Sequence, residues 1–264
     1  MDDPGLAKAT LGGGSPVRAP ASLLPRVLGT LGLGYWYADL DSPLGPVHLA
    51  WGPRGVAALR PAGDPARFEE WFRARTGRPA RRAAGLPTSL ATRLAAAMGG
   101  ARERVPVDLA HLGEFARAVL IKTREIPRGE VRPYSWVARE IGRPRAVRAV
   151  GNALAHNPVP LLVPCHRVVL NDGRLGSYSC GGAVAKRALL DLEGAQPDAL
   201  EELARRGVRF WGSPSTGIFC FPSCHRARRI ASHRRVEFGS EREAAAAGFR
   251  PCRICRPGGP PAGG

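Results

Sequence analysis

Four of the six cysteines lie in two close pairs near the end of the chain, and this spacing is the strongest constraint on its fold. Cys220 and Cys224 are separated by three residues, Cys252 and Cys255 by two, and 27 residues lie between the pairs. Each pair fits one tight turn, and two such turns can close on a tetrahedral Zn²⁺. The same four residues would also suit an iron–sulfur cluster, or they would simply be unrelated free thiols. We predict a zinc site with four cysteine ligands.

The segment that carries these pairs is too short to bury a large core of its own. At this size a bound metal commonly supplies the missing folding free energy. All six cysteines fall in the second half of the chain, which is not the spacing of a disulfide framework, and we expect them to be reduced. The sequence contains no run of about 20 apolar residues, so no membrane span is expected.

The charge of the chain is strongly unbalanced. Its formal net charge is +17, and only three of its 39 basic residues are lysines, so the positive charge is almost all arginine. Arginine binds phosphate through a planar fork of donors, and an excess of this size indicates a polyanionic partner. A bias toward G+C-rich codons would raise the arginine content as well, but it does not explain why acidic residues are so much fewer than basic ones.

Two helices joined by a short turn are predicted in the middle of the chain. The segment LGEFARAVLIKTREI has the apolar spacing of an amphipathic helix that ends at Pro127. It is followed by YSWVAREIG, a break at Arg143 and Pro144, and RAVRAVGNALAHNP. This order of helix, turn and helix is typical of a helix-turn-helix.

The second of these helices has one apolar and one polar face. At 100° per residue, the apolar residues Val147, Val150 and Leu154 fall on one side of the helix. The polar residues Arg145, Arg148 and Asn152 fall on the opposite side. The polar side offers guanidinium and amide groups to DNA, but most charged helix faces are merely solvated. Pattern alone therefore leaves DNA contact and a solvated face equally open.

The first cysteine of the chain stands directly before a histidine, in the run NPVPLLVPCHRVV. A thiol attacks as its thiolate, and an adjacent base that is oriented by a carboxylate can help to form it. His166 is such a base for Cys165, and Glu193 in KRALLDLEG is a carboxylate that could orient it. Neighbours on a strand point to opposite faces, so contact between them needs a turned backbone, which Pro164 favours. A cysteine beside a histidine is, on its own, more often a buried bystander.

The combination of these motifs resembles the O6-alkylguanine-DNA alkyltransferase family. PCHRV is similar to the family's acceptor-cysteine motif, GSY and KRALLDLEG follow it, and the likeness extends from about Tyr35 to Gly194. The resemblance implies an α/β fold in which a ribonuclease-H-like N-terminal subdomain precedes a helical subdomain with a helix-turn-helix that binds the minor groove. It implies that Cys165 takes the alkyl group from guanine O6, that His166 deprotonates Cys165 through a water, and that Glu193 orients His166.

The resemblance also implies roles for residues that would contact the DNA. Tyr134 matches the tyrosine that helps to rotate the nucleotide, and Arg148 matches the finger that fills the gap in the base stack. Asn157 matches the asparagine that braces the helix-turn-helix against the active-site segment. Tyr178 and Ser179 match residues that contact the flipped base. The implied reaction is a single-turnover methylated-DNA–[protein]-cysteine S-methyltransferase reaction that needs no cofactor.

The cysteine-rich tail resembles the metal-binding domain of the bacterial Ada protein through TGIFC, PSC and AAGFRPCRIC. That resemblance implies that Cys220, besides binding zinc, accepts a methyl group from a DNA methylphosphotriester. Thr216 and Arg228 lie near positions that contact DNA in that family. In Ada, however, the metal-binding domain comes first and is followed by a transcription-factor module, which is missing here. A role in transcriptional activation is therefore not predicted.

The domain order that follows from these patterns is simple. We expect a disordered leader over 1–34, the ribonuclease-H-like subdomain over 35–108, the helix-turn-helix alkyltransferase domain over 109–195, the zinc domain over 205–257 and a disordered tail over 258–264.

The expected partner is double-stranded alkylated DNA, and we expect a monomer in the bacterial cytoplasm, associated with the nucleoid. The preferred alkyl group, activity on O4-alkylthymine and the role of Cys180 stay open. A damage-sensing DNA-binding protein without catalysis is the main alternative, although such relatives lack the cysteine found at position 165. A thiol hydrolase is a third reading, for which no oxyanion-hole loop is recognisable.

Overall fold

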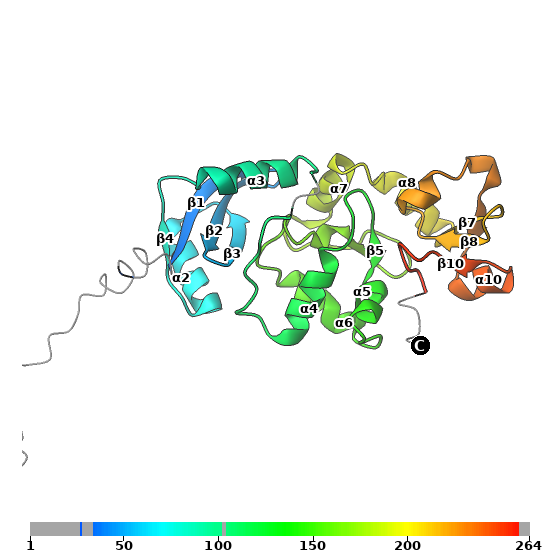
Figure 1. Cartoon of the computed structure of the whole chain (residues 1–264), viewed down its shortest axis with the longest axis horizontal. Coiled ribbons are helices and arrows are strands. Elements are labelled where there is room, and N and C mark those ends of the chain that lie inside the picture. The colour runs from blue at the N-terminus through cyan, green and yellow to red at the C-terminus, as the bar shows by residue number, and fades with distance from the viewer. Residues whose placement is uncertain (1–26, 28–33, 102–103, 259–264) are drawn as a thin grey trace, which may run out of the picture.

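The computed structural model describes residues 27, 34–101 and 104–258. The predicted leader and tail thus lie outside the described residues, except for residues 27, 34 and 258. The described chain forms three parts in a row along the longest axis of the molecule: a part built on a sheet, a helical part and a small part with clustered cysteines (Figure 1).

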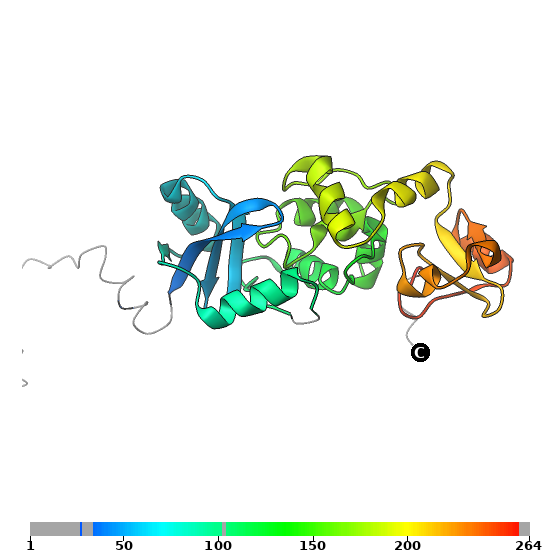
Figure 2. The ribbon, with the colours of Figure 1, turned by 90° about the horizontal axis from the view of Figure 1, so that it is seen from above.

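The first part is a four-stranded sheet with one helix on each face. Three antiparallel strands form a meander, and the last strand runs parallel to the first, which gives the order β3-β2-β1-β4. The strands are β1 (Tyr35–Ser42), β2 (Gly45–Gly52), β3 (Gly55–Pro61) and β4 (Ala80–Arg82). The helices α2 (Pro65–Thr76) and α3 (Thr88–Met98) cover opposite faces (Figure 2).

Alternation of side chains along the strands divides the core of this part in two. Leu49 of β2 points into the core that also contains Leu94 of α3. The next residue, Ala50, packs with Tyr37 and Phe72 in a separate cluster under α2. The core on the α3 side is continuous with that of the helical part, so the sheet and the helices are held as one body.

The helical part begins with α4 (Glu114–Thr123), which is shorter than predicted. The expected helix reaches Pro127, but the structure replaces its last residues with turns in which Glu125 N donates to Lys122 O and Ile126 N to Thr123 O. The reason is local, since a proline disfavours helical backbone at the residue before it.

Both helices of the predicted helix-turn-helix are present, as α5 (Tyr134–Glu140) and α6 (Val147–Ala155). The face assignment of α6 is confirmed, because Val150 and Leu154 are buried whereas Arg148 and Asn152 are exposed. The remaining elements of this part are β5 (Arg132–Pro133), the 3₁₀ turn η1 (Cys165–Arg167), β6 (Val168–Val169), α7 (Gly182–Leu192) and α8 (Pro197–Arg205).

The third part follows α8 and contains a small sheet of order β10-β8-β7-β9. Its elements are β7 (Phe210–Ser213), β8 (Ile218–Cys220), α9 (His225–Arg228), η2 (Ser232–Arg234), β9 (Val236–Phe238), α10 (Glu241–Ala246) and β10 (Arg250–Pro251). Its core is mainly aromatic, with Phe210 edge-on to Phe219 and Phe238 edge-on to Phe249.

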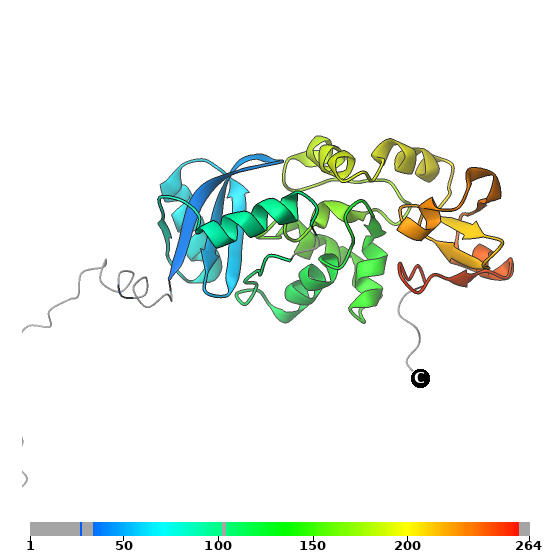
Figure 3. The same ribbon diagram turned by 45° about the horizontal axis from the view of Figure 1, so that its top comes forward.

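The third part lies beside the end of the helical part where α5 and β5 are found (Figures 1 and 3). Among the described residues, no helix combines the length and the apolar character that crossing a bilayer would require. The fold is thus an α/β arrangement of mixed sheets and helices with a cysteine cluster whose core is continuous with that of the helical part.

The turn between β2 and β3 generates a test of the fold. Gly55 has φ +120°, and a Cβ there would lie 2.4 Å from Pro106 O, because residues 106–108 pair with Val56. Gly55→Ala should therefore lower the free energy of unfolding in urea by about 2–4 kcal/mol. Gly45→Ala is the control, since its φ is +86° but a Cβ would meet nothing within 4 Å. It should cost about 1 kcal/mol, and equal losses in the two variants would contradict this packing.

Candidate active site and metal centre

The backbone at Cys165 is turned, as contact with His166 requires. Residues 165–167 form η1, in which Arg167 N donates to Pro164 O and Val168 N to Cys165 O. This turn breaks the alternation of a strand, so consecutive side chains are both buried, Cys165 at 6 % and His166 at 1 % exposure. The 3₁₀ turn therefore allows the Cys165 thiol and its candidate base His166, which are adjacent in the sequence, to be buried together.

Asn157 connects the end of the helix-turn-helix to the thiol. It follows α6 closely, and its Nδ2 donates to Val163 O at 2.9 Å and to Cys165 Sγ at 3.1 Å. Its Oδ1 accepts from Val159 N. The side chain thus fixes the segment between α6 and Cys165 and places a donor directly on the sulfur.

The thiol of Cys165 is protonated at rest. Burial raises its pKa to about 11, although the hydrogen bond from Asn157 favours the thiolate. A thiol with this pKa attacks at neutral pH only if a base removes its proton as the reaction proceeds. The environment of His166 decides whether it can be that base.

Glu193 binds His166 and fixes its tautomer. His166 Nε2 lies 3.0 Å from Glu193 Oε1, and both groups are buried. Burial alone would raise the pKa of Glu193, but the hydrogen bonds from His166 and Arg167 outweigh it and hold the pKa at about 2. An ionised carboxylate only accepts, so Nε2 carries the proton. Nδ1 is then the basic nitrogen, and no described residue hydrogen-bonds to it.

His166 is neutral at physiological pH. Burial lowers its pKa, which the nearby carboxylate of Glu193 only partly offsets. The ring can therefore accept a proton at Nδ1 while it donates from Nε2. Sequence reasoning missed the third member of this group: Arg167 donates to Glu193 from Nε at 2.8 Å and from Nη2 at 2.7 Å.

Tyr178 closes the other side of the site. Its ring stands edge-on to His166 with centroids 6.2 Å apart, and burial together with the nearby Cys165 raises its pKa. Its hydroxyl is buried without a hydrogen-bond partner among the described residues. Ser179 is exposed, and its Oγ lies 3.8 Å from the sulfur of the half-buried Cys180. A buried, protonated hydroxyl near a thiol is suited to donate to an incoming acceptor atom.

Lys186 is a second residue that sequence reasoning missed. It is fully buried on α7, and its Nζ donates to Val168 O and Leu175 O, each at 2.6 Å. Burial lowers its pKa to about 8. These bonds join the strand after Cys165 to the loop that leads to Tyr178, so one cation fixes two walls of the site.

The polar face of α6 is free to meet a partner. Arg148 is exposed and makes no ion pair with any described residue. The ring of Tyr134, at the start of α5, is half-buried, and a Cβ at Gly151 of α6 would lie 3.9 Å from it. Burial raises the pKa of Tyr134, and the nearby Cys165 adds to this effect.

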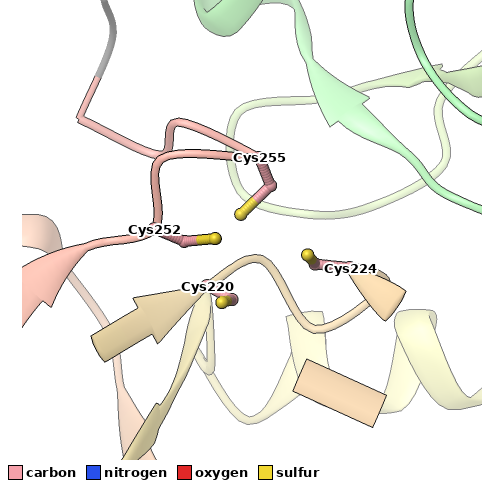
Figure 4. Close-up of side chains that lie close together, drawn as sticks. All are labelled: Cys220, Cys224, Cys252 and Cys255. Carbon is pink, nitrogen blue, oxygen red and sulfur yellow. The ribbon is translucent and has the colours of Figure 1, made fainter. Parts of the chain in front are cut away.

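The four paired cysteines converge on one point (Figure 4). Their Sγ atoms all lie within 4.8 Å of one another, and all four residues are buried. Cys220 ends β8, Cys224 precedes α9, and the other pair follows β10. Four convergent sulfurs in a protected position fit a closed tetrahedral zinc site.

One of these cysteines also lines an open pocket. Cys220 forms part of the wall of a 920 Å³ pocket, whose other described walls include Thr216, Arg226, Arg229 and Arg234. The other three cysteines do not line it. Arg228, in contrast, points to the helical part, where it donates to the backbone carbonyls of residues 129 and 194.

Two family models match the helical part and the part with clustered cysteines. Residues 114–195 match the 6-O-methylguanine DNA methyltransferase DNA-binding domain, and residues 203–258 match the metal-binding domain of Ada. Similar curated proteins include the methylated-DNA–protein-cysteine methyltransferases of Methanosarcina barkeri (36 % identical; 60 % of this chain, 96 % of the relative) and Mycobacterium tuberculosis (37 %; 62 % and 94 %). The Ada match and the four sulfurs identify the metal as Zn²⁺ in the C-terminal part.

A solved structure is similar as well. The crystal structure of Mycobacterium tuberculosis OGT in complex with DNA matches with a TM-score of 0.50 and 34 % identity, over 63 % of this chain and 99 % of that chain. This match covers a larger share of the chain than residues 114–195, which the DNA-binding-domain model matches.

The lowered pKa of Glu193 leads to a prediction about stability and pH. Its folded pKa of about 2 lies below the ordinary value of 4.5, so its contribution is complete above pH 4.5 and is lost as the pH falls toward 2. Glu193→Gln should lower the free energy of unfolding at pH 7 by about 3 kcal/mol. Urea denaturation between pH 7 and 3 should show this difference shrinking.

The control is Glu202→Gln, because Glu202 makes only an exposed ion pair with Arg205. It should change stability by less than about 1 kcal/mol at every pH. A Glu193→Gln penalty that stays constant down to pH 3 would show that the carboxylate is not held ionised by its partners.

Proposed function

The chain belongs to the methylated-DNA–protein-cysteine methyltransferase family, and on that basis we propose that Cys165 is the sulfur that receives the alkyl group from O6-alkylguanine in double-stranded DNA. The observation that carries this assignment is the buried chain of contacts around the thiol, in which Asn157 donates to its sulfur and Glu193 holds the neighbouring His166. The reaction of the family repairs DNA by direct transfer to a cysteine of the protein.

We propose that His166 is the base in this transfer. The thiol proton passes through a water to His166 Nδ1, which is the ring nitrogen left free by Glu193. The bond between Cys165 Sγ and the alkyl carbon forms as the bond between that carbon and guanine O6 breaks. Tyr178 donates its hydroxyl proton to the leaving oxygen, and the proton held by His166 replaces it through solvent. Guanine and a stable thioether result, so each chain acts once and no cofactor takes part.

The buried position of the thiol requires that the base leave the duplex. Cys165 is 6 % exposed, so an alkyl carbon inside stacked DNA cannot reach it. Extrusion costs a few kcal/mol. We propose that α6 binds the minor groove, that Arg148 fills the gap in the stack, and that Tyr134 crowds the phosphate. Ser179 contacts the extruded base.

We also propose a second acceptor site in the metal-binding domain. Cys220 is the zinc-ligand cysteine that lines the arginine-rich pocket, so a DNA phosphate there could bring its methyl ester to this sulfur. Bound zinc keeps the thiolates deprotonated. The Cys220 Sγ–carbon bond would form while the ester carbon–oxygen bond breaks, which leaves an ordinary phosphodiester.

The finer description of the fold belongs to the same proposal. We assign a ribonuclease-H-like subdomain to 35–108, the alkyltransferase domain to 109–195 and the zinc domain to 205–257. We propose that the protein acts as a monomer on alkylated duplex DNA, and therefore in the bacterial cytoplasm at the nucleoid. The rival reading, a sensor that binds damage without reacting, predicts no covalent change at Cys165.

The first experiment follows the methyl group to the protein. Incubation with duplex DNA that contains O6-[³H-methyl]guanine should place one label per chain on the peptide that carries Cys165. Cys165→Ala should take up none, because it lacks the proposed acceptor sulfur. Cys180→Ala is the matched control and should be labelled like the wild type. Label on a folded Cys165→Ala variant, or repeated turnover by one chain, would contradict the assignment.

The second experiment uses duplex DNA with labelled methylphosphotriesters. Label should appear on Cys220, and Cys220→His should lose it while still binding zinc, because histidine is also a zinc ligand. Cys252→His is the matched control: it changes another ligand but leaves Cys220 facing the pocket, and it should still be labelled. Label on Cys224, Cys252 or Cys255 of the wild type would overturn the second assignment.

A further inference from the structure

The metal-binding domain packs directly on the first helix of the helix-turn-helix. Trp136 of α5 donates from Nε1 to the carbonyl of the metal-ligand residue Cys255 at 3.0 Å. On the same helix, Arg139 pairs with Glu241 at 2.8 Å, and Glu140 accepts from Arg256 at 2.8 Å. Trp136 and Glu140 of α5 are therefore bonded to the loop at Cys255 and Arg256, and Arg139 is bonded to α10.

The loop between the first cysteine pair contacts the residue that precedes β5. Ser223 accepts from Val131 N at 3.0 Å and donates to Val131 O at 3.1 Å. Glu130 accepts from His225 N at 3.0 Å, and its ion pair with Arg132 is buried. Buried polar groups of one domain thus find their hydrogen-bond partners in the other domain. A loosely tethered domain would not provide such partners.

One residue of the metal-binding domain contacts the backbone beside Glu193. Arg228, the last residue of α9, donates to Gly194 O at 3.1 Å and to Gly129 O. Gly194 follows Glu193 directly, and a Cβ at Gly129 would lie 2.7 Å from Glu193 O. Gly129 N also lies 3.4 Å from Glu193 Oε2. The guanidinium therefore joins the backbone that carries Glu193 to the turn at Gly129, whose N–H donates to Glu193.

We propose that Arg228 is a positioning residue of the alkyl-transfer site, and that zinc, by ordering the turn from Cys224 into α9, maintains this arrangement. The metal-binding domain is then a part of the alkyltransferase and not an independent module. The chain of contacts runs from Cys224 through Arg228 to the backbone of Gly129 and Gly194. Gly129 N donates to Glu193, which in turn holds His166. The rate readout below rests on the proposed function of Cys165, whereas the hydrogen-exchange readout does not.

The dependence on zinc follows from the size of the domain. A domain this small buries little apolar surface, so its metal provides much of its folding free energy. Loss of the metal would therefore disorder α9, which carries Arg228. It would also disorder Cys255 and Glu241, the partners of Trp136 and Arg139. Because coupling between sites is reciprocal, ordered α5 and β5 segments should in turn favour metal binding.

The kinetic test compares three variants of the full chain loaded with zinc. Arg228→Ala should lower the maximal single-turnover rate of methyl transfer to Cys165 by about tenfold, because a displaced Glu193 misplaces the base. The Kd for duplex DNA should stay within about twofold. Arg228→Lys should recover part of the rate. Arg242→Ala is the matched control: it removes the same charge from the exposed face of α10 and should react like the wild type.

Hydrogen exchange tests the role of the metal without any reaction. Removal of zinc by a chelator should raise exchange at least tenfold in residues 129–140 and 189–195, and leave the sheet over 35–61 unchanged. Faster exchange confined to 209–258, or a wild-type rate in Arg228→Ala, would overturn the proposal. Absence of transfer in the wild type would instead refute the proposed function, and the exchange result would still decide this inference.

Discussion

The buried carboxylate of Glu193 is the interaction on which the site depends. A carboxylate that is almost fully buried is stable only if several donors compensate for its lost hydration. His166 and Arg167 supply those donors. In return, the imidazole of His166 and the guanidinium of Arg167 are each fixed in one orientation. The same residue ends α7 against the turn at Gly129, so the placement of the base follows from the packing of the whole helical part.

This dependence explains why three distant segments meet at one sulfur. Asn157 connects the end of α6 to Cys165, and Lys186 fixes the strand after Cys165 to the loop of Tyr178. Each connection uses a buried polar group that has few alternative partners. In the proposed reaction, such a network leaves the binding energy of the DNA available for extruding the base.

Much of the site could be predicted because its signals are local in the sequence. The spacing of Cys220, Cys224, Cys252 and Cys255 identifies the metal centre, and the 3.6-residue periodicity identifies α6 with its polar face. Pro164 indicated the turned backbone at Cys165, which η1 confirms. The predicted end of α4 at Pro127 was wrong by one turn, because the effect of a proline begins before the proline itself.

The rest could not be predicted, since it depends on contacts between segments far apart in the chain. Arg167, Lys186 and Arg228 are three of many basic residues. Nothing in the neighbouring sequence marks Lys186 as buried, or Arg167 and Arg228 as donors to groups far away in the chain. The most direct test of the account is a crystal structure of the full-length Cys165→Ser variant bound to duplex DNA with O6-methylguanine. The account predicts an extruded base whose methyl carbon lies about 3.5 Å from the residue 165 side chain, with Arg148 in the gap. A base that stays stacked in DNA bound along α6 would contradict it.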